Sequence, residues 1–246
     1  MGLFDFFGGG TPAEKAQKAK AKITQKYGDA SARQGAIADL AKLKSAEVIP
    51  VLMLRFTFVV DPQTTDADEK ENVFQTIASF EKEAVPPVVE FLKKNDAASS
   101  WAIKLLDEVL ETPEVIGIVT DELKHLGAEY TRDPEKKQVL LHWLEGRHDE
   151  RVGPAVLPFL NDMSDDVKLA ALKTLASLKY EPMREPLLQL ATGTETAKRL
   201  QMACVQALSE TGFGTQGFQK KIEAMLGDQF TLDKSGVVKK RGAPAV

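Results

Sequence analysis

The sequence contains little cysteine, few aromatic residues and no long apolar run. Its single cysteine, Cys204, has no partner for an internal disulfide, which fits a reducing compartment. No apolar stretch approaches the length of a membrane span, which needs about 20 residues. Residues 1–7 lack the basic flank and the apolar length of a signal peptide. These absences lead us to expect a cytoplasmic protein.

Motifs of common catalytic chemistry are also missing. The three histidines, His125, His142 and His148, form neither an i, i+4 pair nor a His-Glu dipeptide, so their spacing predicts no metal site. The sequence has no glycine-rich phosphate loop, no Gly-x-Ser-x-Gly and no cysteine matched with an orienting base. We therefore predict no catalytic residue, no metal and no cofactor, and we expect that the chain is not an enzyme.

What the chain has in abundance is the residue set of helices. Alanine, leucine, lysine and glutamate dominate, while aromatic residues make up only 7%, and this usage favours helices over sheets. Residues 1–27 hold five lysines against two acidic residues, and residues 227–246 are also basic. Since the whole chain carries a net charge of −4, the body between the two ends is acidic. An acidic body disfavours nucleic acid as a partner.

One apolar pattern recurs along the chain. In its clearest copy, residues 29–40, three apolar side chains at i, i+1 and i+4 form a single stripe on a helix. The strong copies carry this stripe at Ala36-Ile37-Leu40, Ala102-Ile103-Leu106, Leu140-Leu141-Leu144, Ala171-Leu172-Leu175 and Cys204-Val205-Leu208. A second apolar helix lies between copies and often has proline near its start, where the first turn tolerates it. The pattern predicts an all-α fold of about six stacked helix pairs.

These features together resemble the HEAT-repeat (armadillo-like) family over residues 29–226. Residues 165–175, Asp-Asp-Val-Lys-Leu-Ala-Ala-Leu-Lys-Thr-Leu, match its second helix best, with a loop acid, a basic residue and then small and aliphatic residues. The resemblance implies an α-solenoid, a right-handed α-α superhelix whose second helices line a concave face that mostly binds other proteins. Three-helix armadillo units are the near alternative. HEAT hydroxylases rely on repeated His-Glu pairs and HEAT-like DNA glycosylases on a basic groove, and this sequence shows neither.

The domain organisation follows from these segments. We predict a phenylalanine-rich arm with a glycine hinge (1–12), a lysine-rich leading helix (13–28), the HEAT-like solenoid (29–226) and a basic C-terminal tail (227–246). The tail either forms a small hairpin around its Asp-Lys-Ser-Gly turn or has no fixed structure. The acidic stretch 61–69 is expected to be an exposed loop that ends at a helix cap, Thr65 or Asp66.

Alignment of the repeats singles out candidate binding residues. Lys104, His142, Lys173 and Gln206 share one exposed position and are predicted to form a ridge for an acidic partner. Beside the apolar stripe lie the two tryptophans, Trp101 and Trp143, which either fill the seam between repeats or anchor a partner in the groove. A ladder of basic residues one turn earlier, Arg33, Lys137 and Lys168, is expected to pair with loop acids of adjacent repeats.

The N-terminal arm carries Leu3, Phe4, Phe6 and Phe7 before a triple-glycine hinge. Such an arm docks on the first helix pair, binds a partner, or contacts a membrane surface with the lysine-rich helix behind it.

Our leading functional prediction is a non-catalytic scaffold or adaptor that binds a protein partner through the solenoid groove, the arm, or both. The alternatives are a peripheral membrane adaptor anchored by the arm, and a HEAT-type lyase or other HEAT-fold enzyme. The sequence leaves the partner's identity and the oligomeric state open.

Overall fold

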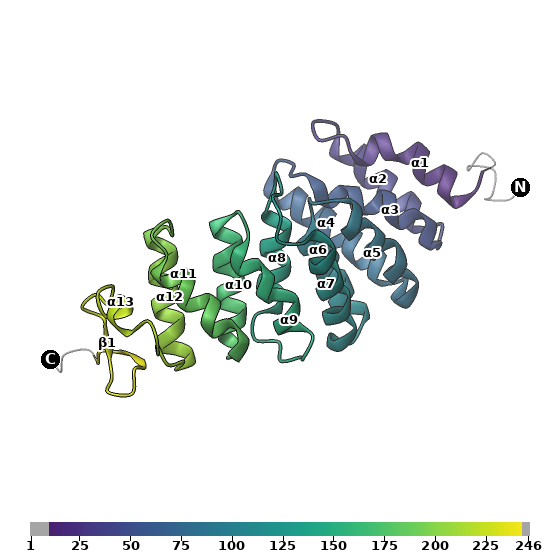
Figure 1. Ribbon diagram of the computed structural model, residues 1–246. Helices are drawn as coiled ribbons and strands as arrows, with labels where there is room; N and C mark the ends of the chain where they lie inside the picture. The colour runs from purple at the N-terminus through teal and green to yellow at the C-terminus, as the bar shows by residue number, and fades with distance from the viewer. Residues whose placement is uncertain (1–9, 243–246) are drawn as a thin grey trace, which may run out of the picture. The chain divides into compact units, whose positions relative to one another are not determined.

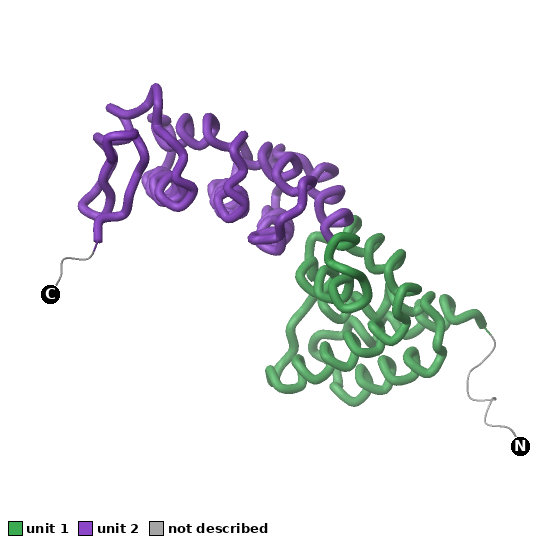
Figure 2. Tube along the Cα trace, turned by 90° about the horizontal axis from the view of Figure 1, so that it is seen from below, with its two compact units in different colours: residues 1–115 green, residues 116–246 purple. Residues whose placement is uncertain are grey.

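The computed structural model describes residues 10–242. The chain forms two compact units, residues 1–115 and residues 116–246 (Figure 2). The described residues are predominantly helical, which confirms the all-α prediction in its coarse form. The arm residues Leu3, Phe4, Phe6 and Phe7 lie outside the described residues. No helix within residues 10–242 is long and apolar enough to cross a membrane.

Unit 1 consists of helices joined by short turns (Figure 1). Its α-helices are α1 (Pro12–Ile23), α2 (Ala30–Ala41), α3 (Ile49–Met53), α4 (Gln63–Ala78), α5 (Val85–Lys94) and α6 (Ser99–Val109). Short 3-10 segments precede or follow them: η1 (Ala46–Val48), η2 (Leu54–Thr57) and η3 (Glu81–Ala84). The boundary between the units falls within α7 (Thr112–Leu126).

Local sequence accounts for where these helices begin. Thr11 and Glu14 form a reciprocal capping box at the start of α1, and the Asp29 side chain accepts a hydrogen bond from the Ser31 backbone N–H at the start of α2. Proline occupies the first turn of α3 and α5, where its missing N–H costs no intrahelical bond.

A buried charge cluster lies inside unit 1, formed by Arg33, Arg55, Asp66, Glu69 and Lys70. The Glu69 carboxylate accepts hydrogen bonds from Arg33 Nε (2.7 Å), Arg33 Nη2 (2.9 Å) and Arg55 Nε (2.7 Å). Asp66 pairs with Arg55 Nη2 and Lys70 Nζ, each at 2.7 Å. Every charge in the cluster therefore has an opposite charge within hydrogen-bonding distance, which buried ions require.

This cluster corrects one sequence prediction. Stretch 61–69 is not an exposed loop with a cap at Thr65 or Asp66, because α4 begins at Gln63 with Pro62 in the N-cap position. Asp66 lies one turn inside the helix and is buried against Arg55. Although burial alone would raise the pKa of Asp66, the hydrogen bonds from Lys70, Arg55 and the Val60 backbone outweigh it and lower that pKa.

Unit 2 continues the helical pattern and ends in a hairpin (Figure 1). Its further α-helices are α8 (Glu135–Leu144), α9 (Val152–Val156), α10 (Asp165–Ser177), α11 (Arg184–Thr192), α12 (Lys198–Thr211) and α13 (Gln219–Glu223). The 3-10 segments are η4 (Leu157–Asn161) and η5 (Glu181–Met183), and the strands are β1 (Phe230–Leu232) and β2 (Val238–Lys240).

Helices α8, α10 and α12 lie side by side in unit 2, with α10 packed against both neighbours. The apolar stripes predicted from the repeats supply this packing, because Leu141, Leu172 and Cys204 are all buried. Thr174 adds a polar link, since its hydroxyl donates to the Leu141 carbonyl of the neighbouring helix at 2.8 Å.

The predicted basic ladder is also structural. Lys137 is buried and pairs with Asp162, a loop acid before α10, at 2.7 Å. Arg33 pairs with Glu69, which belongs to α4 and not to a loop, and Lys168 pairs with Asp165 of its own helix at 3.0 Å. The role predicted for the ladder is therefore confirmed for Lys137, whereas the other two basic residues pair with helical acids.

The tail forms the hairpin that the sequence suggested. Strands β1 and β2 pair antiparallel, with Phe230 opposite Lys240 and Leu232 opposite Val238. Asp233 Oδ1 accepts hydrogen bonds from the backbone N–H groups of Ser235 (2.9 Å) and Val237 (3.0 Å), and Gly236 has a positive φ of 79°. The Asp-Lys-Ser-Gly turn thus supplies both the side-chain acceptor and the glycine that a tight reversal needs.

Candidate functional site

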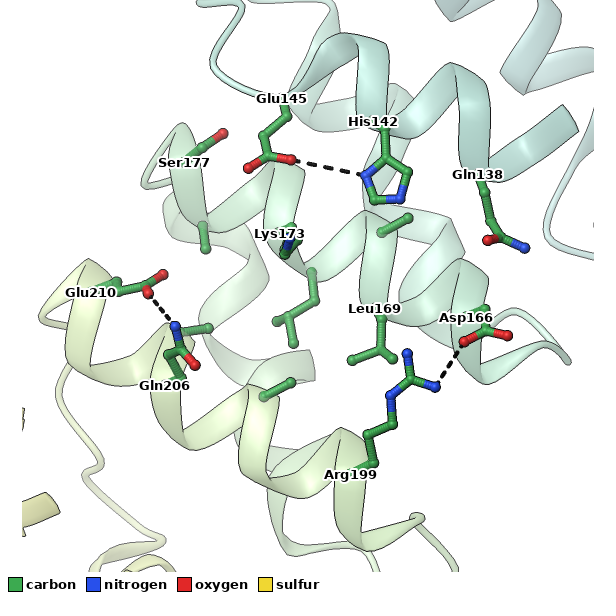
Figure 3. A pocket seen from close by; sticks show the side chains of 15 residues that line it. Gln138, His142, Glu145, Asp166, Leu169, Lys173, Ser177, Arg199, Gln206 and Glu210 are labelled. Carbon is green, nitrogen blue, oxygen red and sulfur yellow. Dashed lines mark hydrogen bonds and ion pairs between the residues drawn. The ribbon is translucent and has the colours of Figure 1, made fainter. Parts of the chain in front are cut away.

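A groove crosses the exposed faces of α8, α10 and α12 in unit 2 and encloses about 440 Å³ (Figure 3). We call it the α8–α12 groove. Its lining residues follow an i, i+4, i+7 spacing along α8 and similar spacings along α10 and α12. Residues at such spacings share one face of a helix, so each helix turns one face toward the groove. The lining residues are Gln138, His142, Glu145, Asp166, Leu169, Ala170, Leu172, Lys173, Ala176, Ser177, Arg199, Ala203, Gln206, Ala207 and Glu210.

Small apolar side chains make up much of the groove's lining. Ala170, Ala176 and Ala207 are buried, and Ala203 is half-buried. Alanine leaves no long side chain between the ridges of neighbouring helices, so the main chain of a guest molecule can approach closely there. Leu169 adds a larger, half-buried apolar side chain.

Polar side chains of both charges surround these apolar residues. At one end, Arg199 of α12 pairs with Asp166 of α10 at 3.0 Å. At the other end, Gln206 Nε2 donates to Glu210 Oε1 at 2.8 Å, and His142 Nδ1 lies 3.9 Å from Glu145 Oε2 (Figure 3). The groove can therefore offer hydrogen-bond donors and acceptors along its whole length.

Lys173 occupies the middle of this arrangement. It lies on α10, which packs between α8 and α12, and its side chain is exposed. Within residues 10–242 its ammonium group forms no ion pair, in contrast to Arg199. Lys173 is thus a cation of the groove that a guest carboxylate can reach without displacing an internal partner.

A second hollow adjoins the groove at α12. It encloses about 340 Å³ and shares Arg199, Ala203, Gln206 and Glu210 with the α8–α12 groove. The hairpin supplies its other wall through Gln229, Phe230 and Lys240. The accessible surface therefore continues from α8 across α12 to the hairpin.

Three of the four residues of the predicted ridge line one groove. These are His142, Lys173 and Gln206, as their shared repeat position implied. Lys104 belongs to unit 1, where its Nζ lies 4.3 Å from the centroid of the Phe74 ring and 3.9 Å from Glu71. Whether any of the four residues binds a partner stays a prediction.

The two tryptophans have different surroundings. Trp101 is half-buried and stacks on Phe56 with ring centroids 4.7 Å apart, and Phe74 lies 6.2 Å from it on another side. Its neighbours come from η2 and α4, so the ring fills a seam between helices of unit 1. Trp143 is half-buried on α8, with the Arg147 guanidinium 3.9 Å from its ring centroid, and is not among the residues that line the groove.

Several groove residues were not singled out from the sequence. Glu145, Asp166, Arg199 and Glu210 lie one or two turns before or after the ridge position on their helices. Extending the aligned ridge by one turn toward the C-terminus would have found Glu145 and Glu210, and extending it by two turns toward the N-terminus would have found Asp166 and Arg199, because a groove across parallel helices repeats along each helix. The pairing of Asp166 with Arg199 depends on lateral packing and leaves no such signal.

The described residues contain no ready metal centre. Within residues 10–242, no group of three or more His, Cys, Asp or Glu side chains is placed to hold a metal ion. Cys204 is buried, and burial raises the pKa of its thiol to about 12.

Comparison with known proteins finds similarity at the level of structure. No protein-family model and no curated protein matches the chain. Among solved structures, human deoxyhypusine hydroxylase in complex with glycerol is similar at 13% sequence identity and a TM-score of 0.37, over 88% of this chain and 91% of that one.

This comparison contradicts two predictions, the non-catalytic scaffold or adaptor and the absence of enzymatic activity. The similar structure is that of an enzyme, so the HEAT-fold enzyme kept as an alternative fits the comparison better. At this identity and TM-score, the similarity carries no reaction or substrate over to this chain. The non-catalytic scaffold or adaptor and the absence of enzymatic activity are therefore withdrawn, whereas binding to a protein partner is not tested by this comparison and stays a prediction.

Proposed function

We propose that the chain is a HEAT-type helical-repeat protein and that its α8–α12 groove binds an extended segment of another polypeptide. The right-handed superhelical arrangement of about six helix pairs, expected from the repeat pattern, belongs to the same proposal.

The observation that carries this proposal is the run of groove residues across three neighbouring helices, α8, α10 and α12. Neighbouring packed helices are about 8 to 10 Å apart, so a groove over three of them is roughly 20 Å long. An extended chain rises about 3.3 Å per residue, which gives room for about six residues of a guest segment. Small side chains along the lining and polar groups around them suit a guest with a polar main chain.

Lys173 gives the groove a preference within this class of guest. Its ammonium group is exposed in the middle of the groove and has no internal ion pair among the described residues. A charge-assisted hydrogen bond from Lys173 to an aspartate or glutamate of the guest contributes about 1.5 to 3 kcal/mol. We therefore expect an acidic residue near the centre of the bound segment.

Selection from a displayed library of random dodecapeptides tests the proposal directly. Enriched peptides are expected to share an acidic residue, and their affinity can be measured by fluorescence anisotropy. Lys173→Glu is expected to weaken binding about tenfold or more, since one charge-assisted bond is replaced by repulsion. Ala203→Trp is expected to block the groove sterically, because Ala203 lies where the groove and the adjoining hollow meet.

Lys179→Glu is the matched control, because Lys179 is an exposed lysine of unit 2 outside the groove. Its affinity for the selected peptides should equal that of the wild type. Selection of no peptide at all, or of peptides that bind Lys173→Glu and Ala203→Trp as tightly as the wild type, would rule out the groove as the binding site.

A further inference from the structure

Helix α1 concentrates positive charge on one exposed face. It contains Lys15, Lys18, Lys20 and Lys22, and its only acidic residue is Glu14. Lys15, Lys18 and Lys22 follow an i, i+3, i+7 spacing, which places them on one face of the helix. A separate face of the helix carries Ala16 and Ile23, which are buried in unit 1.

Three acidic side chains of unit 1 accept hydrogen bonds from neutral donors. Glu14 accepts a hydrogen bond from the Thr11 backbone N–H at 3.0 Å, and Glu47 accepts one from the Ala13 N–H at 3.2 Å. Asp29 accepts hydrogen bonds from both the Ser31 N–H and its hydroxyl, at 2.9 and 2.6 Å. Lys18 and Lys22 are exposed, so their positive charge faces solvent.

A large aromatic side chain follows α1. Tyr27 is 93% exposed, and the Lys26 ammonium lies 5.5 Å from its ring centroid. Aromatic rings beside lysines are the combination favoured at the headgroup level of a bilayer.

We propose that α1 lies against an anionic phospholipid surface, with its lysines toward the headgroups. Lysines of a surface helix attract such a surface by about 1 kcal/mol each, and an exposed aromatic ring next to the helix, here that of Tyr27, adds binding at the headgroup level. This proposal concerns unit 1 alone and is independent of the α8–α12 groove.

Co-sedimentation of the full chain with vesicles tests the proposal. One set of vesicles contains phosphatidylglycerol in phosphatidylcholine, and the other contains phosphatidylcholine alone. We expect the wild type to sediment with the anionic vesicles and to stay in solution with the neutral ones. Lys18→Gln with Lys22→Gln should lower the partition coefficient roughly 30-fold, which is about fivefold for each lysine.

The control is Lys220→Gln with Lys221→Gln, which removes the same charge from two exposed lysines of α13. It should partition as the wild type does, and circular dichroism should show the same helix content for all three proteins. The proposal is overturned if the wild type ignores anionic vesicles, binds neutral vesicles equally well, or is released as much by the control substitutions. Preferential binding to duplex DNA in competition would identify a nucleic acid as the partner instead.

Discussion

Replacing Glu69 by glutamine removes the one carboxylate that the two buried arginines of unit 1 share. The Glu69 side chain accepts three hydrogen bonds from Arg33 and Arg55 at 2.7 to 2.9 Å and is almost wholly buried. Glutamine has nearly the same shape but carries no charge, and its amide group cannot accept all three bonds. Arg33 then has no carboxylate partner in the cluster, while Arg55 still has Asp66.

The magnitude follows from leaving a buried cation without its counter-ion. Removing one partner of a buried ion pair typically costs about 3 to 5 kcal/mol, and the Arg33 guanidinium is 2% exposed, so solvent cannot replace the lost carboxylate. We expect Glu69→Gln to lower the free energy of unfolding of unit 1 by an amount in this range. Urea denaturation should show a lower midpoint with an unchanged slope, because the surface exposed on unfolding stays the same.

Tryptophan fluorescence reports on the two units separately. Trp101 lies in unit 1 and Trp143 in unit 2, so a Trp143→Phe background makes the signal specific for unit 1. Glu71→Gln on the same helix is the matched control, since Glu71 is exposed, and it should change stability by less than ~0.5 kcal/mol. A loss of under ~1 kcal/mol for Glu69→Gln would refute the reasoning, because the cluster would then be solvated or able to rearrange.

Three further predictions concern other parts of the chain. Burial raises the pKa of Glu69, but the hydrogen bonds from Arg33 and Arg55 outweigh it and lower that pKa. The stabilisation from ionised Glu69 should therefore be complete above about pH 4.3 and be lost as the pH falls through the lowered pKa. Acid titration followed by fluorescence should show a less steep loss of stability in Glu69→Gln. Cys204, with a thiol pKa of about 12, should resist iodoacetamide in the native protein and react once urea unfolds it, as mass spectrometry can record. Gly153→Ala should cost about 1 to 3 kcal/mol in urea denaturation, because its added carbon would lie 2.4 Å from the Tyr180 ring.

The helical period explains how much the sequence predicted. Residues three or four apart share a helix face, and repeats in register place equivalent residues on adjacent helices, so the buried stripe and the ridge of His142, Lys173 and Gln206 followed from spacing alone. The buried charge cluster did not follow. Asp66 and Glu69 read as exposed acids because isolated acids usually are, and their burial depends on Arg55, which comes from a different segment.

Lateral contacts account for the rest of what the sequence missed. The ion pair between Asp166 and Arg199 joins residues 33 positions apart and forms only because α10 and α12 pack with their first turns adjacent. Trp101 could either fill a seam or anchor a partner, with the seam favoured. In the structure its ring contacts Phe56 and Phe74, which share no spacing rule with it, and whether it also binds a partner stays a prediction.

The C-terminal hairpin determines how the row of helices in unit 2 ends. Strand β2 packs against α12, and Thr215 ties the chain to the hairpin through its N–H and hydroxyl, each 2.8 Å from the Gly236 carbonyl. A terminal helix left bare would offer its apolar side to any similar helix, including one from another copy. Deleting the hairpin should therefore promote end-to-end association, whereas inserting an extra helix pair ahead of it should lengthen the row and keep its terminus closed.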